Sequence, residues 1–304
     1  MKVLIATEKP FAPAAVEGIK NEIQGAGYEF VLLSKYKEKK ELIAAVCDVD
    51  ALIIRSDQID AEVINAATNL KIIVRAGAGY DNVDLKEATK RNICVMNTPG
   101  QNANAVAELV FGMMIMAARN QFNGASGSEL KGKKLGIHAY GNVGRNVARI
   151  ARGMGMDIYA YDAYCPQVIQ ADGLHLVKSV EELYELSDIV SLHLPLTKET
   201  IQSINKDLLM RLGENGILIN TARKEVVDES ALFEYMSITS NFKYFTDIMP
   251  DNHLKFVESF SSRYFSTPKK MGAQTTEANI NAGIAAAKEI VGYLRDGVDT
   301  FKVN

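Results

Sequence analysis

Short runs of apolar, often β-branched residues alternate with amphipathic stretches along the first part of the chain. The runs are short enough for buried strands, and the stretches between them, such as 14–27 and 39–46, repeat apolar residues at helical spacing. Strands that alternate with helices predict βαβ units and a parallel sheet. The predicted strands of this first series are 3–6, 28–33, 50–54, 70–74 and 92–96.

The pattern changes near residue 98. A turn cluster, NTPGQN at 97–102, is followed by a long apolar stretch at 103–120 that predicts a helix too rich in Met and Ala to face solvent on all sides. A second series of strands and helices begins after it, and an amphipathic helix is predicted at 275–294. The chain is therefore predicted to be an α/β protein with a hinge near 98–101. The strands of the second series are 133–139, 156–162, 187–194, 216–222 and 243–248.

A glycine turn between the first two strands of the second series indicates a dinucleotide site. Strand 133–139 runs into A-Y-G-N-V-G at 139–144, a helix follows, and Asp162 ends the next strand. Small residues let the backbone approach a pyrophosphate at the helix start, and the acid binds ribose hydroxyls. A carboxylate at Asp162 would repel the 2′-phosphate of NADP, so the cofactor is predicted to be NAD. Ala139 stands where this fingerprint usually has its first glycine.

Composition and charge narrow the partners. The 304 residues are 47% hydrophobic, which suits two domains, and the net charge is −3 with 34 basic and 37 acidic residues spread along the chain. We expect no nucleic acid or membrane partner, and a small-molecule substrate instead. The apolar start at 1–6 is too short for a signal or a membrane span. The cysteines Cys47, Cys94 and Cys165 lack metal or redox spacing, so we expect a cytoplasmic protein with reduced thiols, two of them buried.

Eight segments, in order, resemble the signature blocks of the D-2-hydroxyacid dehydrogenase family. The resemblance covers nearly the whole chain and implies two Rossmann-like domains with parallel sheets and the active site in the cleft between them. It implies a substrate domain at 1–97 and 280–304 and an NAD domain at 98–279, with no additional regulatory domain of the kind that longer members carry. Besides the glycine turn, the segments are 53–57, 72–84, 97–108, 187–200, 217–232, 245–251 and 267–279.

The resemblance also implies roles for individual residues. Hydride transfer from a 2-hydroxy acid needs an arginine that clamps the carboxylate and a group that takes the hydroxyl proton; Arg223 matches the arginine. Arg55 and Arg75 match positions that hold a phosphate in family members with phosphorylated substrates. The implied cofactor residues are Tyr140, Gly141, Asn142, Val143, Gly144, Asp162, Pro195, Thr200, Thr221, Ala222, Arg223 and Asp247. The implied substrate residues are Arg55, Ser56, Arg75, Gly77, Ala78, Gly79 and Asn102.

The family's proton-handling histidine is replaced here. Lys269 follows Pro268 at that position, although counting back from Gly272 selects Lys270, and we prefer Lys269. The glutamate that usually orients the histidine is also absent, and Asp251, Asn252 and His253 stand near its place. No metal site is expected. A lysine near neutral pH is a ready proton donor, and it becomes a base when burial lowers its pKa.

Three functions remain open from the sequence. The first is NAD-linked oxidation of a phosphorylated D-2-hydroxy acid, and the second is the same chemistry on glyoxylate, hydroxypyruvate or another D-2-hydroxy acid. The third is a protein that binds NAD and senses it without turnover, which the loss of both histidine and glutamate would allow. Members of the resembled family associate through the long helix after the hinge, and 104–119 is apolar enough to need a partner, so a homodimer is expected.

Overall fold

The structure is a computed structural model that describes all 304 residues, and it divides into two compact units. We call Met1–Asn102 with Gln274–Asn304 the split unit, and Ala103–Ala273 the continuous unit. The domain limits expected from the resemblance, 1–97 with 280–304 and 98–279, differ from these bounds by five or six residues.

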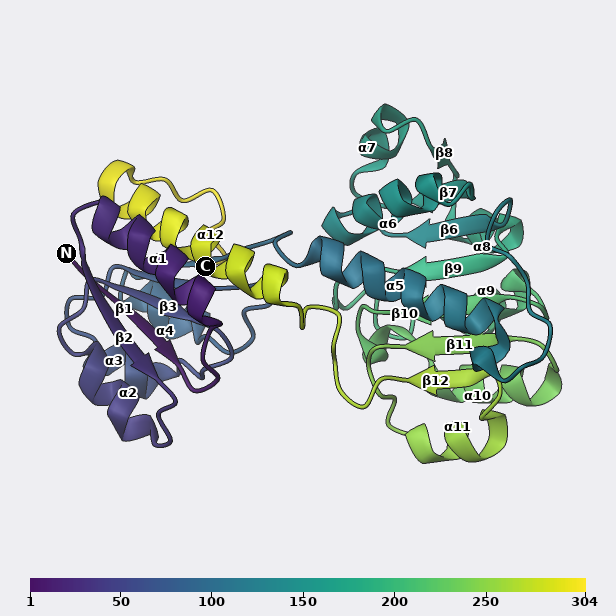
Figure 1. The fold of residues 1–304 in the computed structure, drawn as a ribbon, viewed down its shortest axis with the longest axis horizontal. Helices are drawn as coiled ribbons and strands as arrows, with labels where there is room; N and C mark the ends of the chain where they lie inside the picture. The colour runs from purple at the N-terminus through teal and green to yellow at the C-terminus, as the bar shows by residue number, and fades with distance from the viewer. The chain divides into compact units, whose positions relative to one another are not determined.

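The split unit is built around a parallel sheet of five strands in the order β2-β1-β3-β4-β5. Alternate residues of β1, the neighbour of the central strand β3, face opposite cores: Val3 and Ile5 pack with α1 and α12, and Leu4 packs with α2 and α3. Figure 1 shows α1 and α12 side by side over one face of the sheet. The strands are β1 (Lys2–Thr7), β2 (Glu29–Ser34), β3 (Ala51–Ile54), β4 (Ile72–Arg75) and β5 (Cys94–Asn97). The helices are α1 (Pro13–Gly25), α2 (Lys39–Val46), α3 (Ala61–Ala66), α4 (Leu85–Lys90) and α12 (Thr276–Asp296).

The continuous unit contains a seven-stranded sheet in the order β12-β11-β10-β9-β6-β7-β8, with every pair parallel. The strand order reverses between β6 and β9, and ligands of such sheets bind beyond the carboxyl ends of the strands at this switch point. The strands are β6 (Lys134–His138), β7 (Asp157–Tyr161), β8 (His175–Leu176), β9 (Ile189–Leu192), β10 (Ile217–Asn220), β11 (Lys243–Thr246) and β12 (Tyr264–Ser266). The helices are α5 (Ala103–Ala118), α6 (Asn142–Gly153), α7 (Pro166–Ala171), α8 (Val180–Leu186), α9 (Lys206–Leu212), α10 (Glu229–Ile238) and α11 (His253–Phe260), with 3₁₀ turns η1 (Asn120–Phe122) and η2 (Lys224–Val226).

Helices cover both faces of this sheet. One core packs α5 and α6 against one face of the sheet, including Leu135, Ile137 and Ile219. A second core packs α8, α9, α10 and α11 against the other face. The α/β class and the two parallel sheets predicted from the sequence are confirmed. The short edge strands β8 and β12 lie outside the predicted strands. None of the helices is long and apolar enough to span a membrane.

The structure bears on two expectations that concerned the apolar helix and the cysteines. The apolar residues of α5, among them Val110 and Met114, pack against the sheet of their own unit, so the composition of this helix does not by itself require a partner chain. The homodimer therefore stays a prediction. The expectation of two buried cysteines is wrong: Cys94 is buried in β5, whereas Cys47 and Cys165 are exposed.

Candidate active site

The glycine turn leaves the start of α6 open to a ligand. Gly141 caps the helix without any side-chain hydrogen bond, so the first amides of α6 have no side-chain acceptor. A Cβ at Gly144 would lie 2.5 Å from the carbonyl oxygen of Ala139, so only glycine lets the helix approach the strand this closely. Ala139 itself has φ of 75°, the left-handed region that glycine normally occupies. The turn thus keeps the fingerprint's backbone shape although its first glycine is missing.

Asp162 lies directly against this turn. One carboxylate oxygen accepts from the backbone N–H of Tyr140 at 2.7 Å, and the other accepts from Tyr164 and Cys165 at 2.8 and 2.9 Å. These bonds fix the carboxylate while leaving lone pairs for further donors, such as ribose hydroxyls. The structure therefore brings together the two features that the sequence predicted for one dinucleotide site, the open helix start and the acid that follows β7.

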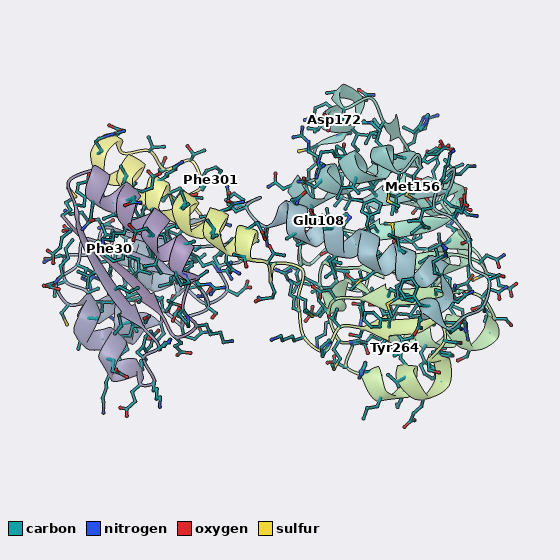
Figure 2. All side chains as sticks on the ribbon, in the orientation of Figure 1. Phe30, Glu108, Met156, Asp172, Tyr264 and Phe301 are labelled. Atoms are coloured by element: carbon teal, nitrogen blue, oxygen red, sulfur yellow. The ribbon has the colours of Figure 1, made fainter.

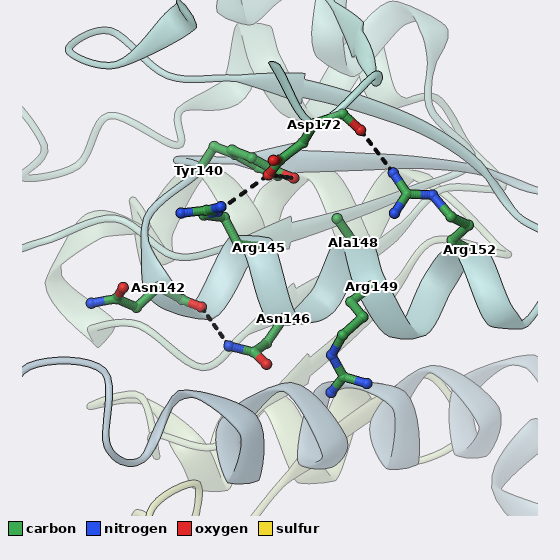
Figure 3. Close-up of a pocket in the computed structure, with 8 residues that line it drawn as sticks. All are labelled: Tyr140, Asn142, Arg145, Asn146, Ala148, Arg149, Arg152 and Asp172. Carbon is green, nitrogen blue, oxygen red and sulfur yellow. Dashed lines mark hydrogen bonds and ion pairs between the residues drawn. The ribbon is translucent and has the colours of Figure 1, made fainter. Parts of the chain in front are cut away.

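The side chain of Tyr140 points away from this ligand edge. Its ring is buried, and its hydroxyl donates to Asp172 at 2.9 Å; burial first, and then this bond, raise the pKa of the phenol. Only the backbone of Tyr140 remains for the predicted cofactor role. Figure 3 shows Asp172 also accepting from Arg145. These residues line a cavity of about 370 Å³ along α6, together with Asn142, Asn146, Ala148, Arg149 and Arg152.

The ends of β10 and β9 carry the next predicted residues. The amide side chain of Asn220 accepts from Ala222 N–H at 2.9 Å and donates to the Arg223 carbonyl at 2.9 Å, which fixes the turn that presents Arg223. The Thr221 hydroxyl is buried without a hydrogen-bond partner in the protein. In the loop after β9, Thr200 donates to the Pro195 carbonyl at 2.6 Å. Asn220 was not identified from the sequence, because its role depends on backbone groups of the turn that follows it.

Asp247, at the end of β11, organises the lysine loop. Its side chain is fully buried and accepts from the Thr267 hydroxyl at 2.9 Å and from the N–H groups of Met271 and Gly272 at 2.7 Å each. These bonds bracket the exposed residues Lys269 and Lys270 on both sides. The resemblance implied that Asp247 accepts from the nicotinamide amide and from adjoining backbone. The structure shows that most of its acceptor capacity is used to hold the loop.

The residues near the missing glutamate are held by a different acid. Glu229, at the first position of α10, accepts from the N–H of Asp251 at 2.7 Å and from the side-chain amide of Asn252 at 3.1 Å. Asp251 forms an ion pair with Lys224, which raises the pKa of that lysine and compensates the charge beside Arg223. Glu229 was missed in the sequence because nothing near it in the chain indicates this contact.

The histidines take packing roles in the structure. His253 shares a hydrogen bond of 2.8 Å with the Tyr264 hydroxyl. His138 is buried beside Tyr184, and burial lowers its pKa to about 4, so it is neutral at physiological pH. Burial likewise lowers the pKa of His193, to about 3. His175 is exposed and stacks on Tyr159 with ring centroids 4.9 Å apart.

The split unit places its predicted residues at the carboxyl ends of β3 and β4. Arg75 Nε donates to the Arg55 carbonyl at 2.9 Å, and its guanidinium lies so close to Gly77 that a Cβ there would be 1.7 Å from Nη1. The Thr98 N–H donates to the Gly77 carbonyl at 3.0 Å, and Asn97 donates to the Ala78 carbonyl at 2.6 Å. The residues placed around these strand ends include the exposed Ser56 and the half-buried Gly79 and Asn102.

Arg55 is held as firmly as Arg75. It donates to the carbonyls of Lys9 and Pro10 at 3.2 Å each and to the Asn279 side chain, and it stacks over Phe11 at 5.1 Å. These acceptors are all neutral, and burial lowers the pKa of its guanidinium. A positive charge whose own hydrogen bonds go to neutral acceptors, with the Asp57 carboxylate as a nearby counter-charge, is suited to an anionic ligand.

Comparisons with known proteins agree with this arrangement. Residues 101–264 match the model of the D-isomer specific 2-hydroxyacid dehydrogenase NAD-binding domain. The NAD⁺-bound 3-phosphoglycerate dehydrogenase of Entamoeba histolytica is 47% identical, with a TM-score of 0.88 over 100% of this chain and 98% of that one. The hydroxypyruvate reductase of Thermotoga maritima is 34% identical over 281 residues, which are 86% of this chain and 90% of that protein. The D-3-phosphoglycerate dehydrogenase of Methanocaldococcus jannaschii is 35% identical over 277 residues, 84% of this chain but 52% of that longer protein.

The chain belongs to the D-2-hydroxyacid dehydrogenase family. It is accordingly an NAD-dependent oxidoreductase, and the prediction of NAD as cofactor is confirmed. The residues present suit this cofactor: the start of α6 has no side-chain cap, Asp162 lies beside it, and the buried Thr221 hydroxyl has no partner in the protein. NAD supplies the hydride acceptor when it is bound.

Proposed function

We propose that this protein oxidises D-3-phosphoglycerate to 3-phosphohydroxypyruvate, the first step of L-serine biosynthesis. The observation that carries the proposal is the pair of arginines at the ends of β3 and β4, joined by the bond from Arg75 Nε to the Arg55 carbonyl at 2.9 Å. Two guanidinium groups suit a phosphate dianion far better than a methyl or hydroxyl group. The 47% identity to a 3-phosphoglycerate dehydrogenase supports the same substrate.

The continuous unit supplies the groups for the reaction in this proposal. The Arg223 side chain donates one hydrogen bond of 2.9 Å, to the Ala222 carbonyl. Its other guanidinium N–H groups therefore remain for the substrate carboxylate and the C2 oxygen. Lys269, in its uncharged amine form, takes the proton of the C2 hydroxyl as the hydride leaves C2, and in its charged form it returns a proton in the reverse reaction. Lys270 is the second candidate for this role. The remaining substrate contacts are the backbone of Gly77 to Gly79, Ser56 and Asn102.

Cofactor contacts complete the proposal. The amides at Gly141 to Gly144 would hold the pyrophosphate, and Asp162 would accept from the ribose. The turn at Thr221 and Ala222, the loop from Pro195 to Thr200 and Asp247 would border the rest of the cofactor. Placing these residues on the cofactor rests on the family resemblance together with the uncapped helix start and the fixed carboxylate.

The test compares three ketones in the reducing direction. NADH absorbance is followed with 3-phosphohydroxypyruvate, hydroxypyruvate and glyoxylate for the parent protein, Lys269→Ala and Lys270→Ala. We expect the phosphorylated ketone to be preferred, and kcat to fall by about 10²- to 10⁴-fold in the variant that loses the proton carrier. Full activity in both lysine variants would refute the proton role.

A further variant tests the phosphate assignment. Arg75→Gln should lower kcat/KM for the phosphorylated ketone by about 100-fold, the value of one lost charge-assisted pair, and leave hydroxypyruvate turnover within a few-fold. Arg295→Gln is the matched control, since this exposed arginine pairs only with neighbouring Asp296. Equal losses on both ketones would mean that Arg75 acts through the fold and not through a phosphate.

A second function is favoured by one comparison. A hydroxypyruvate reductase is 34% identical to this chain over 86% of its length and 90% of that protein. Preference for hydroxypyruvate or glyoxylate over the phosphorylated ketone would establish this alternative.

The proposal includes a cytoplasmic homodimer. Three free cysteines, two of them exposed, suit a reducing compartment. Light scattering coupled to size exclusion would give the mass, and a value of one 33.3 kDa chain would contradict the dimer.

A further inference from the structure

A second pocket, open to solvent on one side, lies in the split unit, away from the strand ends described above. It has a volume of about 220 Å³ and is formed where the chain leaves α12, turns at Gly297 with φ of 70°, and returns to β5. The returning segment is fixed by a bond of 2.9 Å from Val303 N–H to the Val95 carbonyl. Most of the wall is apolar. The lining residues are Met96, Lys288, Glu289, Gly292, Val298, Thr300 and Phe301.

One carboxyl oxygen in this wall has no hydrogen-bond partner. Oε2 of Glu289 is buried without any hydrogen bond, an arrangement that costs free energy and is uncommon in native proteins. Burial raises the pKa of Glu289 to about 8, and no cation of the protein offsets this effect. Glu289 as a whole is half-buried, and a carboxylate against this apolar wall is favoured when it is protonated or when it meets a cation from outside.

The charged groups of the chain around the cavity interact with residues other than Glu289. Lys288, next to Glu289, pairs with Glu22 at 3.7 Å. Asp299 and Lys302 act on Cys94, whose pKa burial raises to about 11, and Asp299 also acts on Tyr293, whose pKa burial raises as well. Cys94 and Tyr293 are therefore neutral near pH 8. Burial, and no charged group of the protein, accounts for the raised pKa of Glu289.

The rest of the wall selects the kind of cation. Phe301, labelled in Figure 2, lines the cavity with an aromatic ring, and ring faces attract cations. Met96 and Val298 supply apolar surface that a hydrated metal ion could not use. We propose that this cavity binds a small organic ammonium ion with a short hydrocarbon group, which pairs with Glu289 and rests on Phe301. The proposal is independent of the catalytic function.

The probe is n-propylammonium chloride, titrated calorimetrically into the full chain in phosphate buffer at about pH 8.5, where the ammonium stays charged. 1-Propanol is the uncharged analogue of equal size, and potassium chloride controls for ionic strength. We expect saturable binding with a Kd on the order of 1 mM for a ligand this small. Glu289→Gln, which keeps the shape and removes the charge, should weaken binding at least tenfold, while Lys288→Gln should leave it within about twofold.

Two further binding measurements test the proposal if Glu289→Gln does not fold. Phe301→Leu should weaken binding by about two- to fivefold through the lost ring face. In the parent protein, binding should strengthen as the pH rises from about 6.5 to 8.5, because the carboxyl group must release its proton to pair with the ammonium. Equal binding of 1-propanol, unchanged affinity in Glu289→Gln, a flat pH profile, or no saturation below about 100 mM would each overturn the proposal.

Discussion

Replacing Asp247 by asparagine tests whether this buried carboxylate holds the lysine loop. The carboxylate accepts three hydrogen bonds from the loop, at 2.9, 2.7 and 2.7 Å. Asparagine can keep its oxygen toward Thr267 and Met271, but its NH₂ group then faces the Gly272 N–H, so two donors oppose each other. The lost bond to a charged acceptor costs about 1.5–3 kcal/mol, and the unsatisfied buried donors add about 1–3 kcal/mol.

The protein avoids most of this cost if the lysine loop detaches from residue 247 while the rest of the chain stays folded. The free energy of global unfolding should therefore fall by only about 1–3 kcal/mol, while the closed loop becomes much less populated. A shift of about 3 kcal/mol in loop closure corresponds to a loss of about 100-fold in kcat if Lys269 or Lys270 carries the proton. Hydrogen exchange at the amides of Met271 and Gly272 reads the detachment directly, without any substrate.

The control is Asp207→Asn, the same chemical change at an exposed carboxylate that pairs with Arg211 one helical turn away. It should alter stability by no more than about 0.5 kcal/mol and leave both exchange and turnover unchanged. If Asp247→Asn keeps parental exchange rates at Met271 and Gly272, the carboxylate does not hold the loop. If exchange accelerates while kcat is unchanged, the loop is held but does not carry the proton.

Two further predictions concern stability. Ala139→Gly should raise the free energy of unfolding by about 0.5–1 kcal/mol, because relief of about 1–2 kcal/mol of strain at φ of 75° exceeds the greater freedom of glycine in the unfolded chain; a lower midpoint in urea would show that Ala139 is not strained. Glu289 has a folded pKa of about 8 against 4.5 in the unfolded chain, so its contribution is present below 4.5 and is lost as the pH rises through 8. The melting temperature of the parent should fall across that range more steeply than that of Glu289→Gln, and parallel curves would contradict the assignment.

Local patterns predicted much of the fold and part of the site. The strands of both series and the helices at 103–120 and 275–294 follow from apolar spacing, which a regular backbone converts directly into one buried face. The glycine turn and Asp162 were also predictable, because the distance from a strand end to the next strand end is set by one βα unit. The edge strands β8 and β12 were missed because two or three residues carry too little pattern to identify.

Contacts between distant parts of the chain were not predictable in this way. Glu229 holds Asn252 across 23 residues, and Asp247 holds Gly272 across 25. Tyr140, expected at the cofactor, turns its side chain inward to Asp172. In each case the partner is chosen by burial, since a polar group removed from water must find a hydrogen bond among whatever groups the packing brings near.

The sequence by itself determined the parallel α/β architecture, the cofactor turn with its acid, and the family, since each depends on residue types at short or ordered spacing. Only the tertiary structure decided that Asp247 holds the lysine loop, that Arg75 lies over Gly77 beside Arg55, and that Glu289 is left without a partner in an apolar cavity. The physical reason is that spacing fixes backbone geometry, whereas the environment of a side chain is fixed by elements that meet only when the chain has folded.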